Sequence, residues 1–131
     1  MLPLSEVQTA LYEALTAALD PVPVLDQAGP NQPYPYATIG EFTAGESDTL
    51  DRESCDFDVT VHVWSREPGM QQLQQLMAQA KDALHRQSFP ATAFQWVATQ
   101  WNYAQTLREP DGKTRHGILR FGVIVFEVTT T

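Results

Sequence analysis

The sequence predicts a single α+β domain, in which an antiparallel sheet of about four or five strands carries two helices packed on one face. Three observations favour this fold: two segments have apolar residues at helical spacing, one segment alternates between apolar and polar residues, and two β-prone segments flank a turn. The 131 residues match the usual size of one domain, and 43% of them are hydrophobic. We therefore expect residues 1–131 to share one core.

The first helix is predicted over residues 5–19. Ser5 and Gln8 have the spacing of a capping box, and an apolar stripe follows at helical spacing, made of Val7, Leu11, Ala14, Leu15 and Ala18. Five prolines then lie between Pro21 and Pro35. Because proline favours turns and extended backbone, we expect this segment to connect the helix to the sheet.

The second helix is predicted over residues 68–86. Pro68 suits the first turn of a helix, where its missing N–H would have no partner within the helix. One apolar stripe then continues through Met70, Leu73, Leu76, Met77, Ala80 and Leu84. At the other end, His85 and Arg86 complement the negative end of the helix dipole and need no further role.

Two strands are predicted between the helices, over residues 36–42 and 57–64. Gly40 weakens the first strand or marks a bulge in it, whereas the second alternates regularly between apolar and polar residues. Between them, residues 43–56 are rich in carboxylates and poor in residues that could fill a core. The sequence therefore predicts an acidic loop there.

A long hairpin is predicted over residues 94–129, with strands at 94–108 and 116–129 and a turn at Glu109-Pro-Asp-Gly112. Regular alternation through the first of these strands would place two sets of residues on opposite faces. The first set is Val97, Trp101, Tyr103 and Leu107, and the second is Phe94, Trp96, Ala98 and Ala104. Both faces would thus carry apolar residues, although helices are expected on only one.

The composition excludes several classes of function. The net charge of −8 argues against a surface that grips nucleic acid, because such a surface needs clustered lysine and arginine. Cys55 is the single cysteine and adjoins acidic residues, so neither a disulfide nor a reactive thiolate is expected. No apolar run is long enough to cross a membrane, and the N-terminus lacks the pattern of a signal peptide. No cofactor is expected, and we expect synthesis in the cytoplasm.

The strand residues allow one catalytic alternative to a structural interpretation. Asp56, Asp58 and His62 would project from one face of a strand, and Glu127 on another strand could complete a divalent-metal site for a small hydrolase. The simpler interpretation is that these residues form the polar half of an alternating strand, which the pattern already requires. We therefore expect no catalytic and no metal site.

Aromatic residues are more numerous on the predicted strands than one face of a small sheet needs. Most would fill the core beneath the helices. A second apolar face, however, favours contact with a neighbouring chain, and the candidate subunit-interface residues are Trp64, Trp96, Trp101 and Tyr103.

Several short phrases, in this order, carry a resemblance to a known family. They are Pro35-Tyr-Ala-Thr-Ile-Gly40, Val61-His-Val-Trp-Ser65, the helix from Gly69 to Leu84, and His116-Gly-Ile-Leu-Arg-Phe121. Together they cover nearly the whole chain, which resembles the tail completion proteins, or tail terminators, of tailed bacteriophages. Each phrase is weak alone, and the order and spacing carry the resemblance.

This resemblance implies a structural virion protein without enzymatic activity. It implies a ring, usually a hexamer, at the head-proximal end of the tail, with the tail tube protein and a neck or head-completion protein as partners. DNA would be only passing cargo. Glu46, Asp48, Asp51 and Glu53 would then line the lumen, where like charge leaves DNA free to slide, or contact a partner, or simply keep the surface soluble. Another neck or tail adaptor protein of related fold is the alternative.

Overall fold

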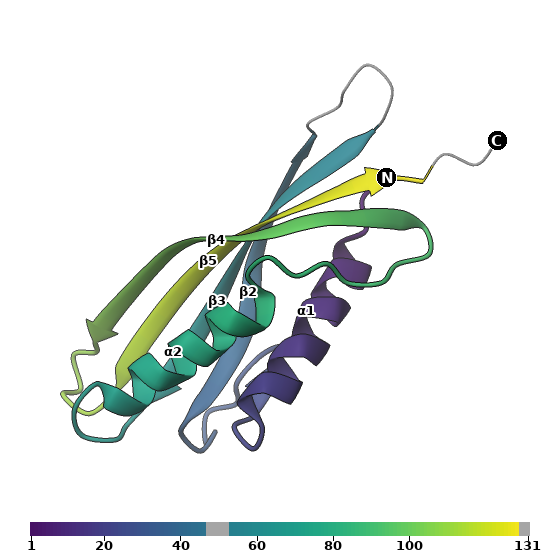
Figure 1. Cartoon of the computed structure of the whole chain (residues 1–131). Coiled ribbons are helices and arrows are strands. Elements are labelled where there is room, and N and C mark those ends of the chain that lie inside the picture. The colour runs from purple at the N-terminus through teal and green to yellow at the C-terminus, as the bar shows by residue number, and fades with distance from the viewer. Residues whose placement is uncertain (47–52, 129–131) are drawn as a thin grey trace.

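A computed structural model describes residues 1–46 and 53–128 of the chain (Figure 1). Within these ranges the chain forms two helices and five strands. They are α1 (Leu4–Leu19), β1 (Val24–Leu25), β2 (Tyr36–Glu46), β3 (Ser54–Ser65), α2 (Gln71–Leu84), β4 (Phe94–Arg108) and β5 (Arg115–Glu127). None of the helices in the described ranges is both long and apolar enough to cross a membrane.

The strands form one sheet in the order β1-β2-β3-β5-β4. Every pair of neighbours is antiparallel except β1 and β2, which pair in parallel at Ala37 and Thr38. The predicted α+β class and the predicted number of strands are confirmed. The short parallel strand β1 was missed, because two residues inside a proline-rich segment give no periodic pattern.

Both helices cover the same face of the sheet (Figure 1), as predicted. The apolar stripe of α1 and that of α2 are buried there, against the inward-facing residues of the strands. The largest side chains that are fully buried in this core include Phe57, Phe121, Leu11, Leu15, Leu73 and Leu84. We call this side the covered face and the opposite side the open face.

Residues 43–46 and 54–56 of the predicted acidic loop at 43–56 are strand, so this prediction was wrong about its bounds, and residues 47–52 lie outside the described residues. Thr43 to Glu46 pair with Cys55 to Asp58 in a regular antiparallel ladder. Backbone hydrogen bonds form this ladder whatever the side chains, so carboxylates at solvent-facing positions do not prevent it. The paired strands extend beyond the helices as a projecting end of the sheet (Figure 1).

Helix starts differ from the sequence prediction in two places. The first residue before α1 is Pro3, which makes no side-chain cap, so the predicted capping box at Ser5 does not form. Helix α2 begins at Gln71 rather than at Pro68, because Gly69 has a positive φ of 85° that an α-helix cannot include.

Two bulges in β4 overturn the predicted assignment of its faces. The register with β5 shifts between Trp96 and Ala98 and again between Trp101 and Tyr103. Each bulge adds a residue without a partner and so reverses the alternation that follows it. Trp96 and Trp101, predicted to lie on opposite faces, both pair with β5 residues of the covered face, whereas Tyr103 pairs with Arg120 of the open face.

Candidate functional site

A row of rings crosses the open face near the end of the sheet that holds the β4–β5 turn. Tyr36, Trp64 and His116 are direct cross-strand partners on β2, β3 and β5. The rings of Trp64 and His116 stack with centroids 3.7 Å apart and planes 6° from parallel, and Tyr36 stacks on Trp64 at 6.1 Å. The row continues to Tyr34, which carries the guanidinium of Arg66 at 4.2 Å. Aromatic pairs of this kind stabilise neighbouring strands.

A chain of four hydrogen-bonded side chains runs beside this row. We call it the histidine relay: Glu41, His62, His116 and Glu109. His62 Nδ1 and His116 Nε2 lie 2.7 Å apart, and each outer ring nitrogen lies 3.1 Å from a carboxylate oxygen, that of Glu41 or Glu109. The relay thereby connects β2, β3, β5 and the turn after β4.

The relay fixes a proton count. Ionised carboxylates only accept hydrogen bonds, so with Glu41 and Glu109 ionised the two outer nitrogens must donate, and the central hydrogen bond then requires one further proton between the two rings. All three hydrogen bonds therefore coexist only when the pair of imidazoles carries a single positive charge. Burial, and then the neighbouring His62, lower the pKa of His116, while Glu109 and Glu41 act in the opposite direction. The geometry and the charges thus disfavour a second positive charge.

Glu41 enters the relay through an unusual backbone conformation. It lies in a bulge of β2, where the register with β3 shifts between Gly40 and Thr43, and its φ is 56°. Residues other than glycine rarely adopt a positive φ. The hydrogen bond from His62 gives the carboxylate a partner in this conformation, so the relay and the bulge support each other.

The β4–β5 turn is held by Asp111. Its carboxylate accepts hydrogen bonds from the Thr114 hydroxyl at 2.6 Å and from the backbone N–H groups of Thr114 and Lys113 at 2.8 Å each. These bonds, led by the Thr114 hydroxyl, lower the pKa of Asp111 to about 2. The turn is therefore ordered by an ionised carboxylate.

Polar and apolar side chains alternate along the rest of the open face. The guanidinium of Arg120 lies 4.9 Å from the ring of Tyr103, and the Thr43 hydroxyl donates to Asp58 at 3.3 Å. A shallow groove lies between these pairs, lined by Glu41, Thr43, Asp58, Thr60, Asn102, Tyr103 and Arg120. Tyr103, Leu107 and Ile124 are exposed here although they are large and apolar. An exposed apolar sheet face is typical of a surface that meets another protein.

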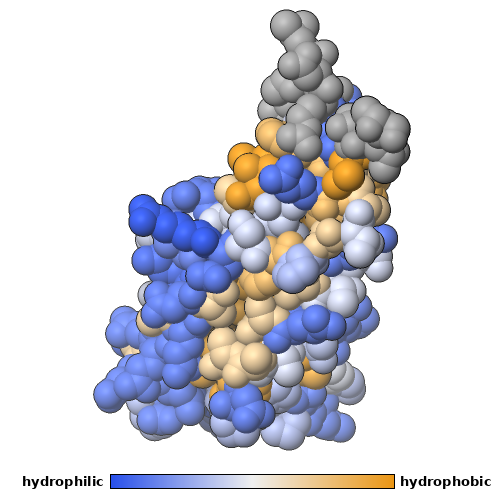
Figure 2. All heavy atoms as spheres, turned by 45° about the vertical axis from the view of Figure 1, so that its right-hand side comes forward, coloured by the Kyte–Doolittle hydropathy of each residue, from blue (hydrophilic) through white to orange (hydrophobic). Residues whose placement is uncertain are grey.

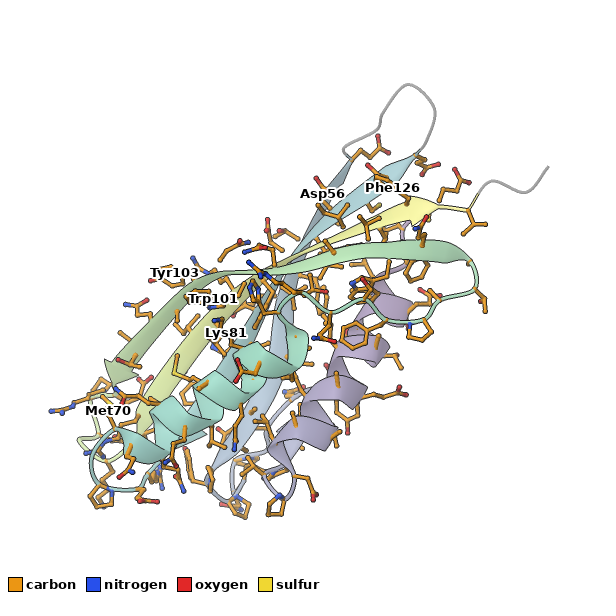
Figure 3. The ribbon with its side chains drawn as sticks, viewed as in Figure 1. Asp56, Met70, Lys81, Trp101, Tyr103 and Phe126 are labelled. Atoms are coloured by element: carbon orange, nitrogen blue, oxygen red, sulfur yellow. The ribbon has the colours of Figure 1, made fainter. Side chains whose placement is uncertain are left out.

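The four predicted interface residues divide between the two faces. Trp64 and Tyr103 lie on the open face, Tyr103 exposed and Trp64 half-buried. Trp96 is buried, and its indole N–H donates to Thr99 at 2.8 Å. Trp101 packs toward α2, where the ammonium of Lys81 lies 4.9 Å from its ring (Figure 3). Of the four residues, only Trp64 and Tyr103 therefore lie where a neighbouring subunit could contact them.

Two of the predicted acidic contact residues, Glu46 and Glu53, lie at the projecting end. Glu46 is the exposed last residue of β2, and Glu53 precedes β3 and forms an ion pair with the α-amino group of Met1. This contact lowers the pKa of Glu53. Asp48 and Asp51 lie outside the described residues. Hydrophobic side chains gather near the same end (Figure 2), and the exposed apolar residues Leu2 and Val128 adjoin it.

The alternative metal site does not come together. Residues on one face of a strand are separated by about 3.4 Å for each residue along the chain, so Asp58 and His62 lie about 14 Å apart and Asp56 farther still. A metal ion with bonds of about 2 Å cannot join them. Instead Asp58 pairs with Thr43, His62 belongs to the relay, and Asp56 lies in the projecting end (Figure 3).

Sequence reasoning missed the relay. It considered His62 with carboxylates on its own strand and gave His116 no role. The available signal was that His62 and His116 fall at open-face positions of two predicted strands. The four side chains come together only through tertiary features: the register that pairs Trp64 with His116, the bulge at Glu41, and the turn that brings Glu109 beside His116.

Comparison with known proteins identifies the family of this chain. The sequence profile of the family described as "Tail completion protein gp17" matches residues 6–125, which include almost all of the two helices and of the sheet. The chain belongs to this family. Tail completion proteins of the gp17 family are structural proteins of the phage tail and not enzymes, so the chain is a structural virion protein.

Relatives with names and structures agree with the membership. The tail completion protein gp17 of Bacillus phage SPP1 is 27% identical over 97 residues, which cover 74% of this chain and 72% of that protein. The solved structure of SPP1 gp17 has a TM-score of 0.59 at 22% identity, over 99% of this chain and 94% of that one. A chain in the virion of a native gene transfer agent particle has a TM-score of 0.78 at 19% identity, over 92% and 94%. These two structures show that the fold is shared.

Proposed function

We propose that the protein forms a hexameric ring that caps the finished tail tube, ends its polymerisation and joins it to the head-neck connector, with DNA passing through the lumen. The observation that carries the proposal is the family match over residues 6–125. This match includes both the covered face, which stabilises the fold, and the open face, which has surface left for partners. The protein would lie at the head-proximal end of the tail.

The surfaces of the chain support assembly. A ring requires a heterologous interface, in which one patch of a subunit meets a different patch of the next. The open face offers exposed Tyr103, Leu107 and Ile124 together with half-buried Trp64. Removing these apolar side chains from water on assembly is favourable by about 25 cal/mol for each Å². We propose that Trp64 and Tyr103 contribute to the subunit interface.

The projecting end supports contact with the tail tube or the neck protein. Carboxylates such as Glu46 lie there beside exposed apolar residues, and an apolar patch with a polar rim is the composition of a protein–protein contact. Lining of the lumen by Glu46, Asp48, Asp51 and Glu53 is the other possibility, since a conduit benefits from like charge. An assembled structure with these four residues outside the lumen would exclude that possibility.

Mass measurement of the purified protein, alone and mixed with tail tube protein, tests the proposal. We expect either a ring in isolation or a ring that forms on the ends of tubes and stops their growth. The control is the same tube preparation without this protein, which should continue to elongate. A chain that stays monomeric and leaves elongation unchanged contradicts the proposal. Binding to a neck protein without binding to tubes would favour the alternative adaptor function.

A further inference from the structure

Each outer edge of the sheet is covered over only part of its length by the chain itself. At the β2 edge, β1 pairs with Ala37 and Thr38, and the Ala37 N–H donates to Pro23 O at 3.0 Å. In the described part of the chain, no strand pairs with the outer side of β2 from residue 39 to 46. The covered part lies near the β4–β5 turn, and the free part leads into the projecting end.

The β4 edge is covered in the opposite half. The segment after α2 binds it: Arg86 N–H donates to Thr99 O at 2.8 Å, Trp101 N–H donates to His85 Nδ1 at 3.1 Å, and the Ser88 hydroxyl donates to Val97 O at 3.4 Å. Among the described residues, no comparable contact reaches the outer backbone of residues 102–108. This free part leads toward the β4–β5 turn.

The free segment of β4 has the properties of a strand that is used for pairing. A free edge in a natural sheet is usually blocked by lysine, proline or extreme shortness. Residues 102–108 contain neither lysine nor proline, and only Arg108, at their end, is charged. All of them are exposed, and Tyr103 and Leu107 expose 39% and 37% of their surface although they are large and apolar.

The directions of the two free edges fit one another. Since β2, β3, β5 and β4 are antiparallel in succession, the two edge strands run in opposite directions. Rotation about a ring axis preserves these directions, so β4 of one subunit would meet β2 of the next in antiparallel orientation. The two free parts lie at opposite ends of the sheet. Pairing them requires a stagger, which tilted strands accommodate in a closed sheet.

We propose that residues 102–108 of β4 pair with the free edge of β2, residues 39–46, of a second copy of this chain, so that one sheet continues from subunit to subunit. This inference rests on the proposed ring and names the contact that builds it. The bulge at Glu41 divides the β2 edge, so the regular ladder is expected over Thr43 to Glu46. Repetition around a ring leaves no subunit with a free edge.

Two variants on β4 test the contact with matched chemistry. Leu107 and Val97 expose 37% and 38% of their surface, and only Leu107 lies in the free part of the edge. Leu107→Lys should raise the concentration needed for ring assembly about tenfold or more, because a buried unpaired charge is costly. Val97→Lys should change it less than about twofold. Circular dichroism and thermal unfolding should show both variants folded.

Cross-linking identifies the partner strand. Gln105→Cys on β4 and Thr43→Cys on β2 replace exposed residues that both lie on the open face, whereas the native Cys55 is buried. A short thiol cross-linker should give covalent dimers when the two variants are mixed and assembled, and none with either variant alone. Gln75→Cys on the exposed side of α2 is the control in the same mixture.

The outcomes separate this inference from the ring itself. Rings that assemble equally well with Leu107→Lys, and that give no cross-link in the mixture, overturn the inference and leave the ring in place. Cross-links in Gln105→Cys alone would indicate two-fold pairing of β4 with β4 and also overturn it. Absence of any ring, with or without tubes, overturns the proposed function and this inference together.

Discussion

The covered face and the open face of the same strands differ in what holds their side chains. On the covered face, β3 and β5 present Phe57, Val59, Phe121 and Val123, which are fully buried beneath two helices. On the open face, the same strands present His62, Trp64 and His116, which stack or form hydrogen bonds, and Ile124, which is exposed. Burial in the core fixes the positions of the first set, whereas contacts between individual side chains fix the positions of the second.

This difference separates folding from recognition. Burial of apolar area is the dominant stabilising term, so the covered face should account for most of the free energy of unfolding. The open face contributes smaller and directional terms, and its exposed residues remain available for partners. Substitutions on the two faces and in the β4–β5 turn can test this division.

The largest effect is expected from Phe121→Ala on the covered face of β5, where the side chain is fully buried. The variant should lose about 3–5 kcal/mol of unfolding free energy, because a cavity remains in the core. Ile124→Ala on the open face of the same strand, where the side chain is 38% exposed, should lose less than about 1 kcal/mol. Urea unfolding measures both, and equal losses would contradict the division.

The second prediction concerns the contact between α2 and β5. A Cβ atom added to Gly117 would lie 2.5 Å from Met77 Sδ and 3.0 Å from Met77 Cγ. Gly117→Ala should therefore cost about 1–3 kcal/mol through overpacking. Combining it with Met77→Ala should cost less than the sum of the two single losses, because the clash is gone. Strict additivity in this double-mutant cycle would show that the two residues do not compete for space.

The third prediction concerns the histidine relay on the open face. Since the pKa of His116 is lowered in the folded protein, the unfolded chain binds more protons below the ordinary value of 6.5. The contribution of His116 is thus present above pH 6.5 and is lost as the pH falls below it. His116→Gln should reduce stability at neutral pH by about 0.5–1.5 kcal/mol and flatten this dependence.

The readout for the relay is urea unfolding at several pH values, with imidazole ¹⁵N chemical shifts as a second measurement. The ¹⁵N shifts should report a pKa of His116 below its ordinary value, as burial and the neighbouring ring require. Glu46→Gln is the matched control for Glu41→Gln, since both are exposed carboxylates of β2 and only Glu41 joins the relay. Identical profiles for these two variants would refute the relay as a coupled unit.

The smallest effect is expected at Asp111 in the β4–β5 turn. Its pKa is lowered from 3.8 to about 2, so its contribution is present above pH 3.8 and is lost as the pH falls toward 2. Asp111→Asn should therefore lower stability above pH 3.8, where the contribution is present, and flatten the acid dependence of unfolding between pH 3.8 and 2. Thr114→Val, which removes the donating hydroxyl, should act in the same direction. No change in either acid profile would contradict the role of these bonds.

Much of the covered face was predictable from the spacing of apolar residues along the chain. Helix periodicity identified the buried stripes of α1 and α2, and alternation placed Phe57, Val59, Val61 and Val63 in the core. The predictions failed in β4, where two bulges reverse the alternation and bring Trp96 and Trp101 to the same face. A bulge changes the side on which every later residue lies, and the residues themselves do not mark it.

The sequence by itself determined the α+β class, the two helices on one face and the resemblance to tail completion proteins, because periodicity and residue order are properties of the chain. Only the tertiary structure decided which edges of the sheet are free and which side chains join across strands. The relay spans residues 41–116, and the covering of β4 by residues 85–88 depends on where α2 ends. Such contacts are set by strand register and bulges, which depend on the packing of the whole sheet.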